Sequence, residues 1–394
     1  MKKIILFIEG IETQEYFSKQ LAKTFRSLGH EIFLFQLLKE RESFIKLYRF
    51  IEKENTVMLT FNFHGLCGEE CFYKENKIFW EEQEIPCYNI VLDHPFYYHK
   101  FGKYIPPDYT QISIDRGHEN YMKRFFPSIK LGPFLPLAGS KVRKKGWEER
   151  RQDIVFTGNY TPPQKFNQYV DRIDEEYREF YQAIIDDLIL HPSIAMEEAF
   201  EKHLVTAIPG ICDEDLKVCM ENMIFIDLYV RFYFRGLVVK TLVDYGYPVH
   251  VYGSGWNLLE CIHPENLIVH GPQDSIGCLK AIADSRISLN VMPWFKDGAH
   301  DRVFNSMLNG AVCLSDDSKW MRENLEEGKE IVCYSLEHVD ELPVIVSELL
   351  KQPERMKEIA YLGFKKANTY HTWGCRARIL SDLFEILNME EEKK

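Results

Sequence analysis

The chain has 394 residues, of which 45% are hydrophobic, and its formal net charge is -12. This length favours two or more domains, and the hydrophobic share is that of a globular protein that buries sizeable cores. The acidic balance argues against a dedicated nucleic-acid-binding protein, because neutralising phosphates requires basic surface. It does not exclude a small anionic ligand, for which a few local donors suffice.

The N-terminal residues MKKIILFIEG resemble the start of a signal peptide, but the apolar run 4–8 is short and Glu9 follows it, so we expect a first strand. No other stretch approaches the roughly 20 apolar residues that span a bilayer. We therefore expect no integral membrane segment, with peripheral contact left open. The ten cysteines include no CxxC pair and no zinc-finger spacing, which favours reduced thiols in a cytoplasmic protein.

The first third of the chain alternates short apolar runs with helical stretches. Residues 17–28 form an amphipathic run that Gly29 ends. Because apolar strands separated by helices form a parallel sheet covered on both faces, we expect one doubly wound domain over residues 1–140. The expected strands are 3–8, 31–37, 56–63, 87–92, 111–114 and 130–136.

Residues 140–152 read SKVRKKGWEERRQ and carry charge without an apolar face. We expect residues 141–152 to be a solvated linker. The alternative is that its basic residues attract an acidic acceptor or a membrane.

A second alternation begins at Asp153, where DIVFTG predicts a strand that closes in a glycine turn. Residues 164–237 have helical periodicity and predict a helical insertion. We expect a second doubly wound domain over residues 153–375, then a C-terminal helix and tail over 376–394. The further strands expected are 249–253, 267–270, 287–291, 311–315 and 330–333. Residues 356–387 are expected to be helical, with a frayed end at EEEKK.

The segment 292–334 carries the chemistry that the sequence indicates most strongly. It follows an apolar strand with a loop containing Asp297, Gly298, His300 and Asp301, and a helix is expected from Arg302 to a stop at Asn309-Gly310. The free N–H groups at the start of that helix can hold a phosphate. Arg302 can add donors to a diphosphate, Gly298 lets a ligand approach the backbone, and Asp297 can accept hydrogen bonds from sugar hydroxyls.

This segment resembles the donor-binding segment of GT-B glycosyltransferases, most closely that of the CgeB-like (spore maturation protein) family. The similar features are the helix start DRVF, which includes Val303, the strand NGAVCLSDD and the approach LEEGKEIV. In the larger retaining GT-B family the segment runs acid, seven residues, acid, then a small-residue turn. Asp297 matches the first acid, Asn305 the second and residues 306–310 the turn. The resemblance implies that position 305 bonds the nucleotide ribose, more weakly as asparagine than as an acid.

Two glycine turns add to the donor site that the resemblance implies. VFTGNY, with Gly158 and Asn159, resembles the glycine-rich opening of the second domain, and VHVYGSGW, with Gly253, Ser254 and Gly255, resembles a loop near the nucleotide. In the family a basic residue often follows the first of these glycines. Asn159 stands there, so we expect Arg302 to supply the phosphate charge. For the second turn, tight-turn geometry alone is the alternative.

In the first domain, the strand-end His94 of IVLDHPFYYHK resembles the histidine that faces the donor in GT-B enzymes. The alternative is a turn with a satisfied histidine. Gly10 follows the first strand, where this fold often brings a glycine close to the donor phosphate or acceptor. His64 is a weaker candidate, His99 is expected to be structural or acceptor-side, and His30 to be a packing residue.

The adjacent Asp316 and Asp317 suggest a metal site, because the other sugar-transferase architecture, GT-A, holds a divalent ion with an Asp-x-Asp motif. This pair follows a late strand of the second domain. We favour capping of the helix that begins near Ser318-Lys319 and expect no metal site.

Taken together, the sequence predicts an α/β GT-B fold with two doubly wound, Rossmann-like domains facing a central cleft. The expected activity is metal-independent, hexosyltransferase-like transfer from a nucleotide sugar, with a UDP-sugar expected as donor, no cofactor and an unidentified acceptor (glycan, protein or cell-surface component). The alternatives are a nucleotide-sugar 2-epimerase and a non-catalytic spore or surface assembly protein. The expected catalytic residues are His94, Asp297 and Arg302. The expected donor-binding residues are Gly10, Gly158, Asn159, Gly253, Ser254, Gly255, Gly298, His300, Asp301, Val303 and Asn305.

Overall fold

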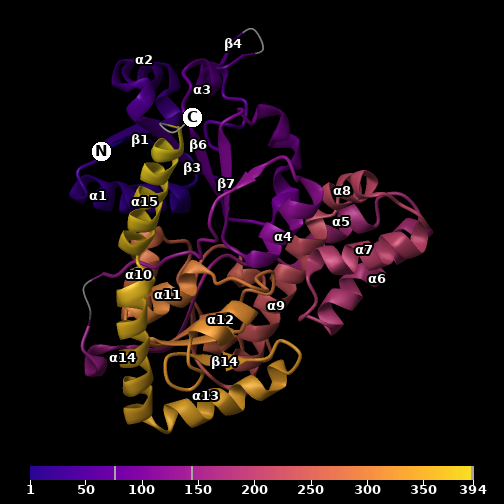
Figure 1. Ribbon diagram of the computed structural model, residues 1–394. Helices are drawn as coiled ribbons and strands as arrows, with labels where there is room; N and C mark the ends of the chain where they lie inside the picture. The colour runs from indigo at the N-terminus through magenta and orange to yellow at the C-terminus, as the bar shows by residue number, and fades with distance from the viewer. Residues whose placement is uncertain (75–76, 143–144, 392–394) are drawn as a thin grey trace. The chain divides into compact units, whose positions relative to one another are not determined.

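The computed structural model describes residues 1–74, 77–142 and 145–391. It contains two compact units, which are described separately: unit 1 is Met1–Pro136 with His371–Lys394, and unit 2 is Leu137–Tyr370. Each unit is built on a six-stranded parallel sheet with helices around it (Figure 1). The part of the expected frayed end at 392–394 lies outside the described residues.

The sheet of unit 1 has the strand order β2-β1-β3-β6-β7-β8, and all of its pairs are parallel. Its six strands are those that the sequence predicts, with shifted ends. The strands are β1 (Lys3–Ile8), β2 (Glu31–Gln36), β3 (Thr56–Phe61), β6 (Cys87–Val91), β7 (Tyr109–Ser113) and β8 (Lys130–Leu131). A short antiparallel pair, β4 (Tyr73–Lys74) and β5 (Lys77–Ile78), lies outside the sheet. The helices are α1 (Glu12–Ser27), α2 (Glu40–Phe50), α3 (Phe79–Glu82), α4 (Arg116–Phe125), α15 (Trp373–Glu391) and the 3-10 segment η4 (Pro95–Tyr104).

Burial on both faces explains why these strands read as continuous apolar runs. Every residue of β3 is buried. On one face, Phe7, Phe35, Phe72 and Trp80 form an aromatic core, with Phe7 and Phe35 ring centres 5.5 Å apart. This packing fixes the sheet whose strand ends carry the polar residues described below.

The C-terminal helix belongs to unit 1 rather than to the second domain. The sequence predicts one helical stretch over 356–387, but the structure has two helices, α14 (Pro353–Tyr370) and α15. The break follows His371, where the Thr372 hydroxyl accepts a hydrogen bond from Cys375 N at 3.2 Å, as an N-cap does. α15 then packs on α1, and His30 Nε2 lies 2.8 Å from Ser381 Oγ. His30 is therefore a buried packing residue, as expected.

The sheet of unit 2 has the order β11-β10-β9-β12-β13-β14, again with parallel pairs. Its strands also match those predicted. They are β9 (Gln152–Thr157), β10 (Val249–Tyr252), β11 (Leu267–Val269), β12 (Ser285–Asn290), β13 (Val312–Asp316) and β14 (Val332–Tyr334). Helices α10 (Ser275–Ala283), α11 (Asp301–Leu308), α12 (Lys319–Asn324), α13 (Leu342–Leu350) and α14 follow in chain order.

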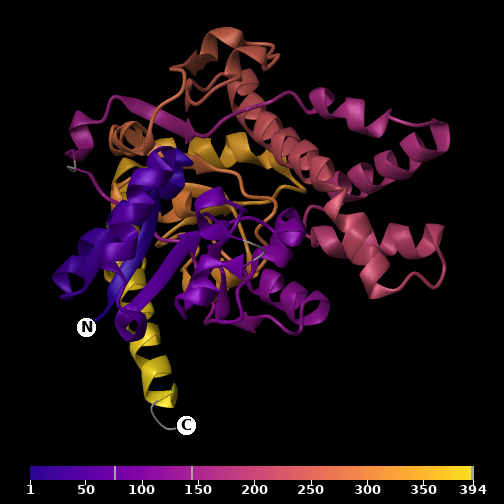
Figure 2. The ribbon, with the colours of Figure 1, turned by 90° about the horizontal axis from the view of Figure 1, so that it is seen from above.

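A helical insertion separates β9 from β10, as the sequence predicts. Its helices are α5 (Asn167–Val170), α6 (Glu175–Leu190), α7 (Met196–Ala207), α8 (Asp213–Glu221) and α9 (Ile224–Tyr245). α6 packs on both α7 and α9, and the shorter helices gather along the first half of α9 (Figure 2). The long α9 then leads through the left-handed Gly246, with φ 104°, into β10. α9 therefore joins the insertion to the sheet.

The segment expected to be a solvated linker is attached to unit 2. Arg150 is buried and its guanidinium donates to the carbonyls of Ser285 and Asn309, the latter at 2.8 Å. Arg151 and Lys145 both pair with Asp284, at 2.7 and 2.5 Å. Arg150 is buried without an apolar face because carbonyl groups accept from its two terminal nitrogens, while most other described residues of the segment are exposed. Residues 143–144 of this segment lie outside the described residues.

No helix in the described part of the chain is long and apolar enough to cross a bilayer.

Candidate functional site

The sheet of unit 2 reverses its strand order between β9 and β12. The chain runs outward from β9 through β10 to β11 and returns to β12 on the other side of β9. Ligands of open parallel sheets bind outside the carboxyl ends of the strands at such a switch point. The residues that follow β9, β10 and β12 therefore form the candidate site.

Two glycine turns interlock at the ends of β9 and β10. Gly158 has φ 149°, and Gly253 and Gly255 have φ 155° and 84°. A Cβ atom at Gly253 would lie 2.2 Å from the Gly158 carbonyl oxygen, and one at Gly255 would lie 2.0 Å from that of Tyr160. Only glycine fits these positions, so the two turns can pack directly against each other.

Asn159 and Ser254 hold the two turns together. Asn159 Oδ1 accepts a hydrogen bond from Ser254 N at 2.9 Å, and Tyr160 N donates to Ser254 O at 2.9 Å. Both side chains are exposed. Asn159 therefore shapes the turn, and it brings no positive charge to it.

Arg302 lies at the switch point with its guanidinium buried. Its Nη1 donates to the carbonyl of Thr157, which ends β9, at 3.1 Å, and its Nη2 to the carbonyl of Val291, which follows β12, at 3.4 Å. A Cβ atom at Gly158 would lie 3.1 Å from this Nη1, so the guanidinium lies directly against the glycine turn. Burial lowers the pKa of Arg302. The group is nevertheless charged at neutral pH, because arginine starts from a pKa above 12.

A second buried guanidinium, which the sequence analysis missed, lies at the same turn. Arg235 of α9 is 9% exposed, and its Nη1 donates to the carbonyl of Asn159 at 3.0 Å. Its Nε is buried without a hydrogen-bond partner among the described residues. Burial, and next the charges of Arg302 and Arg231, hold the pKa of Arg235 well below its usual value. Cations therefore approach the Gly158–Asn159 turn from both α9 and α11.

Arg231, one helical turn before Arg235, extends this cluster. Its Nη2 donates to Asp227 Oδ2 at 2.7 Å. The guanidinium carbons of Arg231 and Arg235 lie 4.1 and 5.3 Å from the ring centre of Trp294. Residues four apart share a helix face, so the spacing of the two arginines was a usable sequence signal. The sequence analysis missed this signal because it assigned the helix to an insertion rather than to the donor site.

His300 and Asp301 stand beside Arg302 at the start of α11. His300 Nδ1 lies 2.6 Å from Asp301 Oδ1, and its Nε2 lies 3.5 Å from Arg302 Nη2. Burial, and then the Arg302 charge, lower the pKa of His300 to about 4, so its ring is neutral at neutral pH. Burial acts to raise the pKa of Asp301, but His300 and Arg302 outweigh it and hold that pKa below its usual value. The Asp301 carboxylate is therefore charged.

The other predicted residues of this segment have varied places. Asp297 is half-buried and lies 3.6 Å from Lys319 Nζ, while the Gly298 carbonyl accepts from Ser318 Oγ at 2.5 Å. Val303 is buried in the core, so its side chain has no ligand-facing surface. Asn305 uses both ends of its amide: Oδ1 accepts from Ser140 N at 2.8 Å and Nδ2 donates to Asp301 Oδ2 at 2.9 Å.

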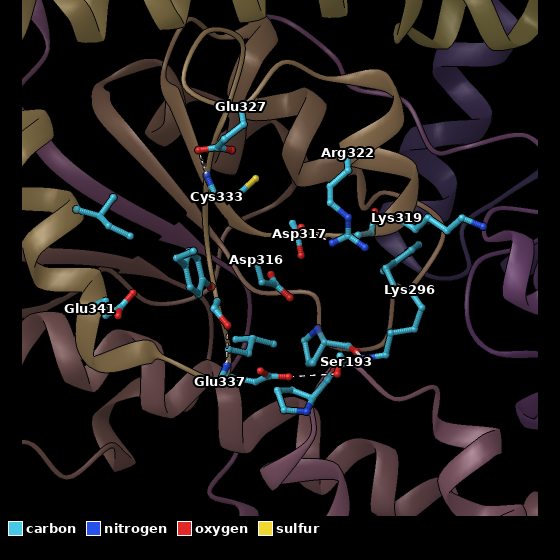
Figure 3. A pocket seen from close by; sticks show the side chains of 18 residues that line it. Ser193, Lys296, Asp316, Asp317, Lys319, Arg322, Glu327, Cys333, Glu337 and Glu341 are labelled. Carbon is cyan, nitrogen blue, oxygen red and sulfur yellow. Dashed lines mark hydrogen bonds and ion pairs between the residues drawn. The ribbon is translucent and has the colours of Figure 1, made fainter.

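A cavity of about 530 Å³ opens beside the loop that carries Asp297, at the carboxyl ends of β12, β13 and β14. Figure 3 shows Lys296, Lys319 and Arg322 grouped on one side of it, opposite Glu341. Lys296 reaches from this loop to the carbonyl of Pro192, which lies between α6 and α7. The cavity therefore has both donors and acceptors of hydrogen bonds, and the insertion forms part of its wall.

The Asp316-Asp317 pair does not cap a helix, contrary to expectation. Ser318 is the N-cap of α12, where its Oγ accepts from Met321 N at 3.1 Å. Asp316 instead accepts from Met292 N at 2.8 Å, and Asp317 pairs with Arg322. Burial raises the pKa of Asp316 to about 7. Within the described ranges, no group of three or more histidine, cysteine, aspartate or glutamate residues could hold a metal ion.

In unit 1, Gly10 and His94 follow β1 and β6. A Cβ atom at Gly10 would lie 2.7 Å from His64 Cε1, so this glycine and His64 are in contact. His94 is buried at the start of η4, where its Nδ1 accepts from Phe96 N at 3.3 Å, and it packs against His118 and Tyr121. Its local geometry is that of a capping histidine.

His99 Nε2 lies 3.1 Å from Tyr121 OH in the same aromatic group, which fits the structural alternative for His99. The structure thus brings together the predicted residues of unit 2 around two glycine turns and the start of α11. Gly10 and His94 lie at strand ends of the other unit.

Residues 232–382 match a family model described as glycosyl transferase-like. No curated protein sequence matches the chain. The domain that carries β10–β14, Arg235 and Arg302 is therefore glycosyl transferase-like in sequence.

Three solved structures share the fold of the chain at low identity. Sucrose-phosphate synthase from Thermosynechococcus elongatus has TM-score 0.54 and 9% identity, over 98% of this chain and 99% of that one. HepE of Anabaena, solved with UDP-glucose, has TM-score 0.51 and 11% identity, over 98% and 100%. An alpha-glucosyltransferase, solved with UDP and a 13-mer DNA, has TM-score 0.55 and 11% identity, over 97% and 99%. Together with the two parallel six-stranded sheets, they establish a GT-B fold.

Proposed function

We propose that the chain is a glycosyltransferase that moves a sugar from a nucleotide-sugar donor to the hydroxyl group of an acceptor. The observation that carries this proposal is a pair of buried guanidiniums, Arg235 and Arg302, on two sides of a glycine turn at the switch point of unit 2. Neither forms an ion pair with a carboxylate of the described residues. Buried charges require a partner, and a diphosphate would supply the missing negative charge.

The diphosphate would lie against the backbone of the Gly158–Asn159 and Gly253–Gly255 turns. Glycine at these positions allows the close approach that a phosphate needs, and the dipole of α11 favours an anion near its first turn. Gly253, Ser254 and Gly255 would shape the opposite wall. His300 would hold the Arg302 guanidinium in place through its contact with Arg302 Nη2, and Asp301 would hold the His300 ring. Arg235 thus takes the role that a basic residue at position 159 would have.

The sugar would extend toward the cavity beside Asp297 and Gly298. A saccharide needs both acceptors and donors, which Asp317, Lys319 and Arg322 provide at the cavity wall. The expected ribose contact from Asn305 stays a prediction, because both ends of its amide are already bonded. The donor role of Gly10 and the proton-handling role of His94 also stay predictions.

The donor nucleotide, the type of transfer, the family and the compartment are also part of the proposal. A UDP-sugar is the proposed donor, because HepE was solved with UDP-glucose and the alpha-glucosyltransferase with UDP. Hexosyl transfer without a metal and membership of the CgeB-like family follow from the resemblance of segment 292–334. Ten free cysteines support a reducing compartment such as the cytoplasm.

The reaction breaks the bond between the anomeric carbon and the diphosphate oxygen, and the electron pair leaves with the diphosphate. The acceptor oxygen forms the new bond to the anomeric carbon and its hydroxyl proton is released. Negative charge therefore develops on the diphosphate in the transition state. Arg235 and Arg302 would stabilise that charge from fixed positions, which is how such sites usually gain most of their rate.

Titration calorimetry with UDP-glucose tests this proposal, after a thermal-shift screen of UDP-, GDP-, TDP- and CDP-sugars has identified the base. Arg302→Met keeps a long apolar stem and removes the charge. We expect it to weaken donor binding by about 1.5–3 kcal/mol, the range of a charged hydrogen bond. The matched control is Arg286→Met, because Arg286 lies in β12 of the same sheet and pairs with Asp153 at 2.5 Å.

Equal donor affinity in Arg302→Met and the native chain, with both folded, would contradict the proposed site. The two alternatives have their own signatures. A 2-epimerase would convert the donor with no acceptor present, which NMR of the incubated donor detects. A non-catalytic assembly protein would bind no nucleotide sugar of the panel.

A further inference from the structure

The strand ends of unit 1 carry strained backbone that is not supplied by glycine. Among the described residues, four that are not glycine have positive φ. Three of them follow two strands: Glu9, with φ 66°, comes after β1, and Asn62 and Phe63, with φ 46° and 67°, come after β3. Side chains other than glycine adopt this region at a cost, and such residues concentrate at functional sites.

These two strands are the ones between which the sheet of unit 1 reverses its order. The chain passes from β1 to β2 on one side and then to β3 on the other side of β1. The strained residues therefore lie at the switch point of this sheet, where a parallel sheet binds ligands. Strain and topology are independent observations that point to the same place.

Hydrogen bonds and contacts fix the two strand ends. Asn62 Nδ2 donates to Asp93 Oδ2 at 3.1 Å, and its Oδ1 accepts from Leu92 N at 2.7 Å, so the end of β3 is tied to the end of β6. His64 lies against Gly10, which joins the loops after β1 and β3. The switch point is therefore an ordered surface of polar groups.

The Glu9 carboxylate has one oxygen that is not used. Oε1 accepts from Gln36 Nε2 at 2.6 Å, while Oε2 is buried with no hydrogen-bond partner in the described part of the chain. Glu9 N donates to Glu15 Oε2 at 2.8 Å, which fixes the backbone. The side chain as a whole is half-buried and next to the exposed Gly10, so Glu9 lies at the edge of the protein surface. A buried acceptor without a donor costs stability, and a ligand hydroxyl would remove that cost.

We propose that Glu9 binds the acceptor substrate, and that its carboxylate accepts a hydrogen bond from a hydroxyl of a neutral, saccharide-like acceptor. The ligand is called an acceptor because this inference rests on the proposed transferase function. The chemistry selects the class of ligand. A carboxylate accepts from hydroxyl groups, and an anionic acceptor would be repelled by Glu9.

The test compares two glycine substitutions at strained glutamates. Glu9→Gly relieves the positive φ and removes the carboxylate, and Glu84→Gly relieves a φ of 52° at an exposed site that pairs with Lys53. Because glycine adopts this backbone freely, both variants should melt within a few degrees of the native chain. The ligands are methyl α-D-glucopyranoside and, as its anionic counterpart, glucose 6-phosphate, with binding followed by saturation-transfer NMR.

We expect the native chain and Glu84→Gly to bind the neutral glycoside more tightly than glucose 6-phosphate. Glu9→Gly should bind the glycoside about ten-fold more weakly or worse, as loss of a charged hydrogen bond implies. It should keep its affinity for UDP-glucose, because Arg235, Arg302 and the glycine turns proposed to hold the diphosphate lie in unit 2. Unchanged glycoside affinity in Glu9→Gly, or a native chain that prefers the phosphate or binds neither sugar, overturns the inference. Absence of UDP-glucose binding in the native chain would instead overturn the transferase proposal and leave the Glu9 result interpretable as a saccharide site.

Discussion

The switch points of the two sheets differ in the residues that adopt unusual backbone conformations and in the charge of the side chains there. In unit 2, Gly158 and Gly253 provide the unusual backbone and Arg235 and Arg302 provide positive charge. In unit 1, Glu9, Asn62 and Phe63 adopt the unusual backbone in addition to Gly65, and the carboxylate of Glu9 follows β1. Both regions follow parallel strands with the same backbone hydrogen bonding, so the difference in charge comes from the side chains after the strands.

This contrast shows how one architecture can serve two ligands. Bare glycine turns with guanidiniums suit an anion that must touch backbone amides. Strained turns with carboxylates and amides suit hydroxyl groups that need aimed acceptors. Fold alone would not distinguish the two, because function lies in the site residues rather than in the sheet.

The largest expected effect is a loss of stability when a glycine at the switch point of unit 2 is replaced. Gly253→Ala places a Cβ atom 2.2 Å from the Gly158 carbonyl oxygen at φ 155°. We expect a loss of about 3 kcal/mol or more in the free energy of unfolding, because both the clash and the backbone are unfavourable. Urea denaturation measures this, and Glu9→Gly should show no such loss. Gly246→Ala is the control, since its φ is 104° but no atom lies within 4 Å of the new Cβ. Similar losses at both glycines would mean that the interlocked turns are not tight.

A buried carboxyl group tests whether the strand ends of unit 2 tolerate negative charge. Burial raises the pKa of Asp316 to about 7 from 3.8. The folded state therefore holds this proton more tightly than the unfolded state, and the group costs stability increasingly as pH rises from about 4 to 7. Asp316→Asn should remove that cost. The stability of the variant relative to the native chain should rise by about 2–4 kcal/mol over this window, at 1.36 kcal/mol per pKa unit. A difference that does not change with pH would show that Asp316 is ionised at little cost.

The second guanidinium should matter about as much as the first for donor binding. Arg235→Met removes a charge that no carboxylate of the described residues pairs with, so the fold should gain or lose little, while UDP-glucose affinity should fall by about 1.5–3 kcal/mol. Calorimetry measures the affinity. Arg235 belongs to unit 2 and Glu9 to unit 1, so Arg235→Met should leave glycoside binding unaffected. Lys240→Met is the control, because Lys240 lies on the same helix and pairs with Asp244, at 2.6 Å. If Arg235→Met bound the donor normally, the charge at the turn would come from Arg302 alone.

The smallest expected effect concerns the residue that replaces a cation at the glycine turn. Asn159→Ala removes one hydrogen bond to Ser254 N at an exposed site, so donor affinity should fall by about 1 kcal/mol or less. Asn159→Lys restores the basic residue typical of the resembling family and should raise donor affinity relative to Asn159→Ala. No gain from the lysine would indicate that Arg235 already occupies the place of that charge.

Much of the fold could be predicted because apolar periodicity is local. All twelve strands of the two parallel sheets were expected near their observed positions, and so was the insertion between β9 and β10. The break at His371-Thr372 was not predicted, because a helix cap in a polar stretch leaves only a weak trace in periodicity. The attachment of residues 145–151 was missed because it depends on Asp284 and on carbonyls more than a hundred residues away.

The sequence by itself determined the two parallel sheets and the glycine turns, because alternation of apolar runs and the spacing of glycines act on neighbouring residues. Only the tertiary structure decided which charges meet. Arg235 reaches the Asn159 carbonyl across 76 positions of the chain, and Arg302 reaches Thr157 across 145. Burial and electrostatics depend on distance in space, so no local pattern could distinguish these two arginines from the many that remain in solvent.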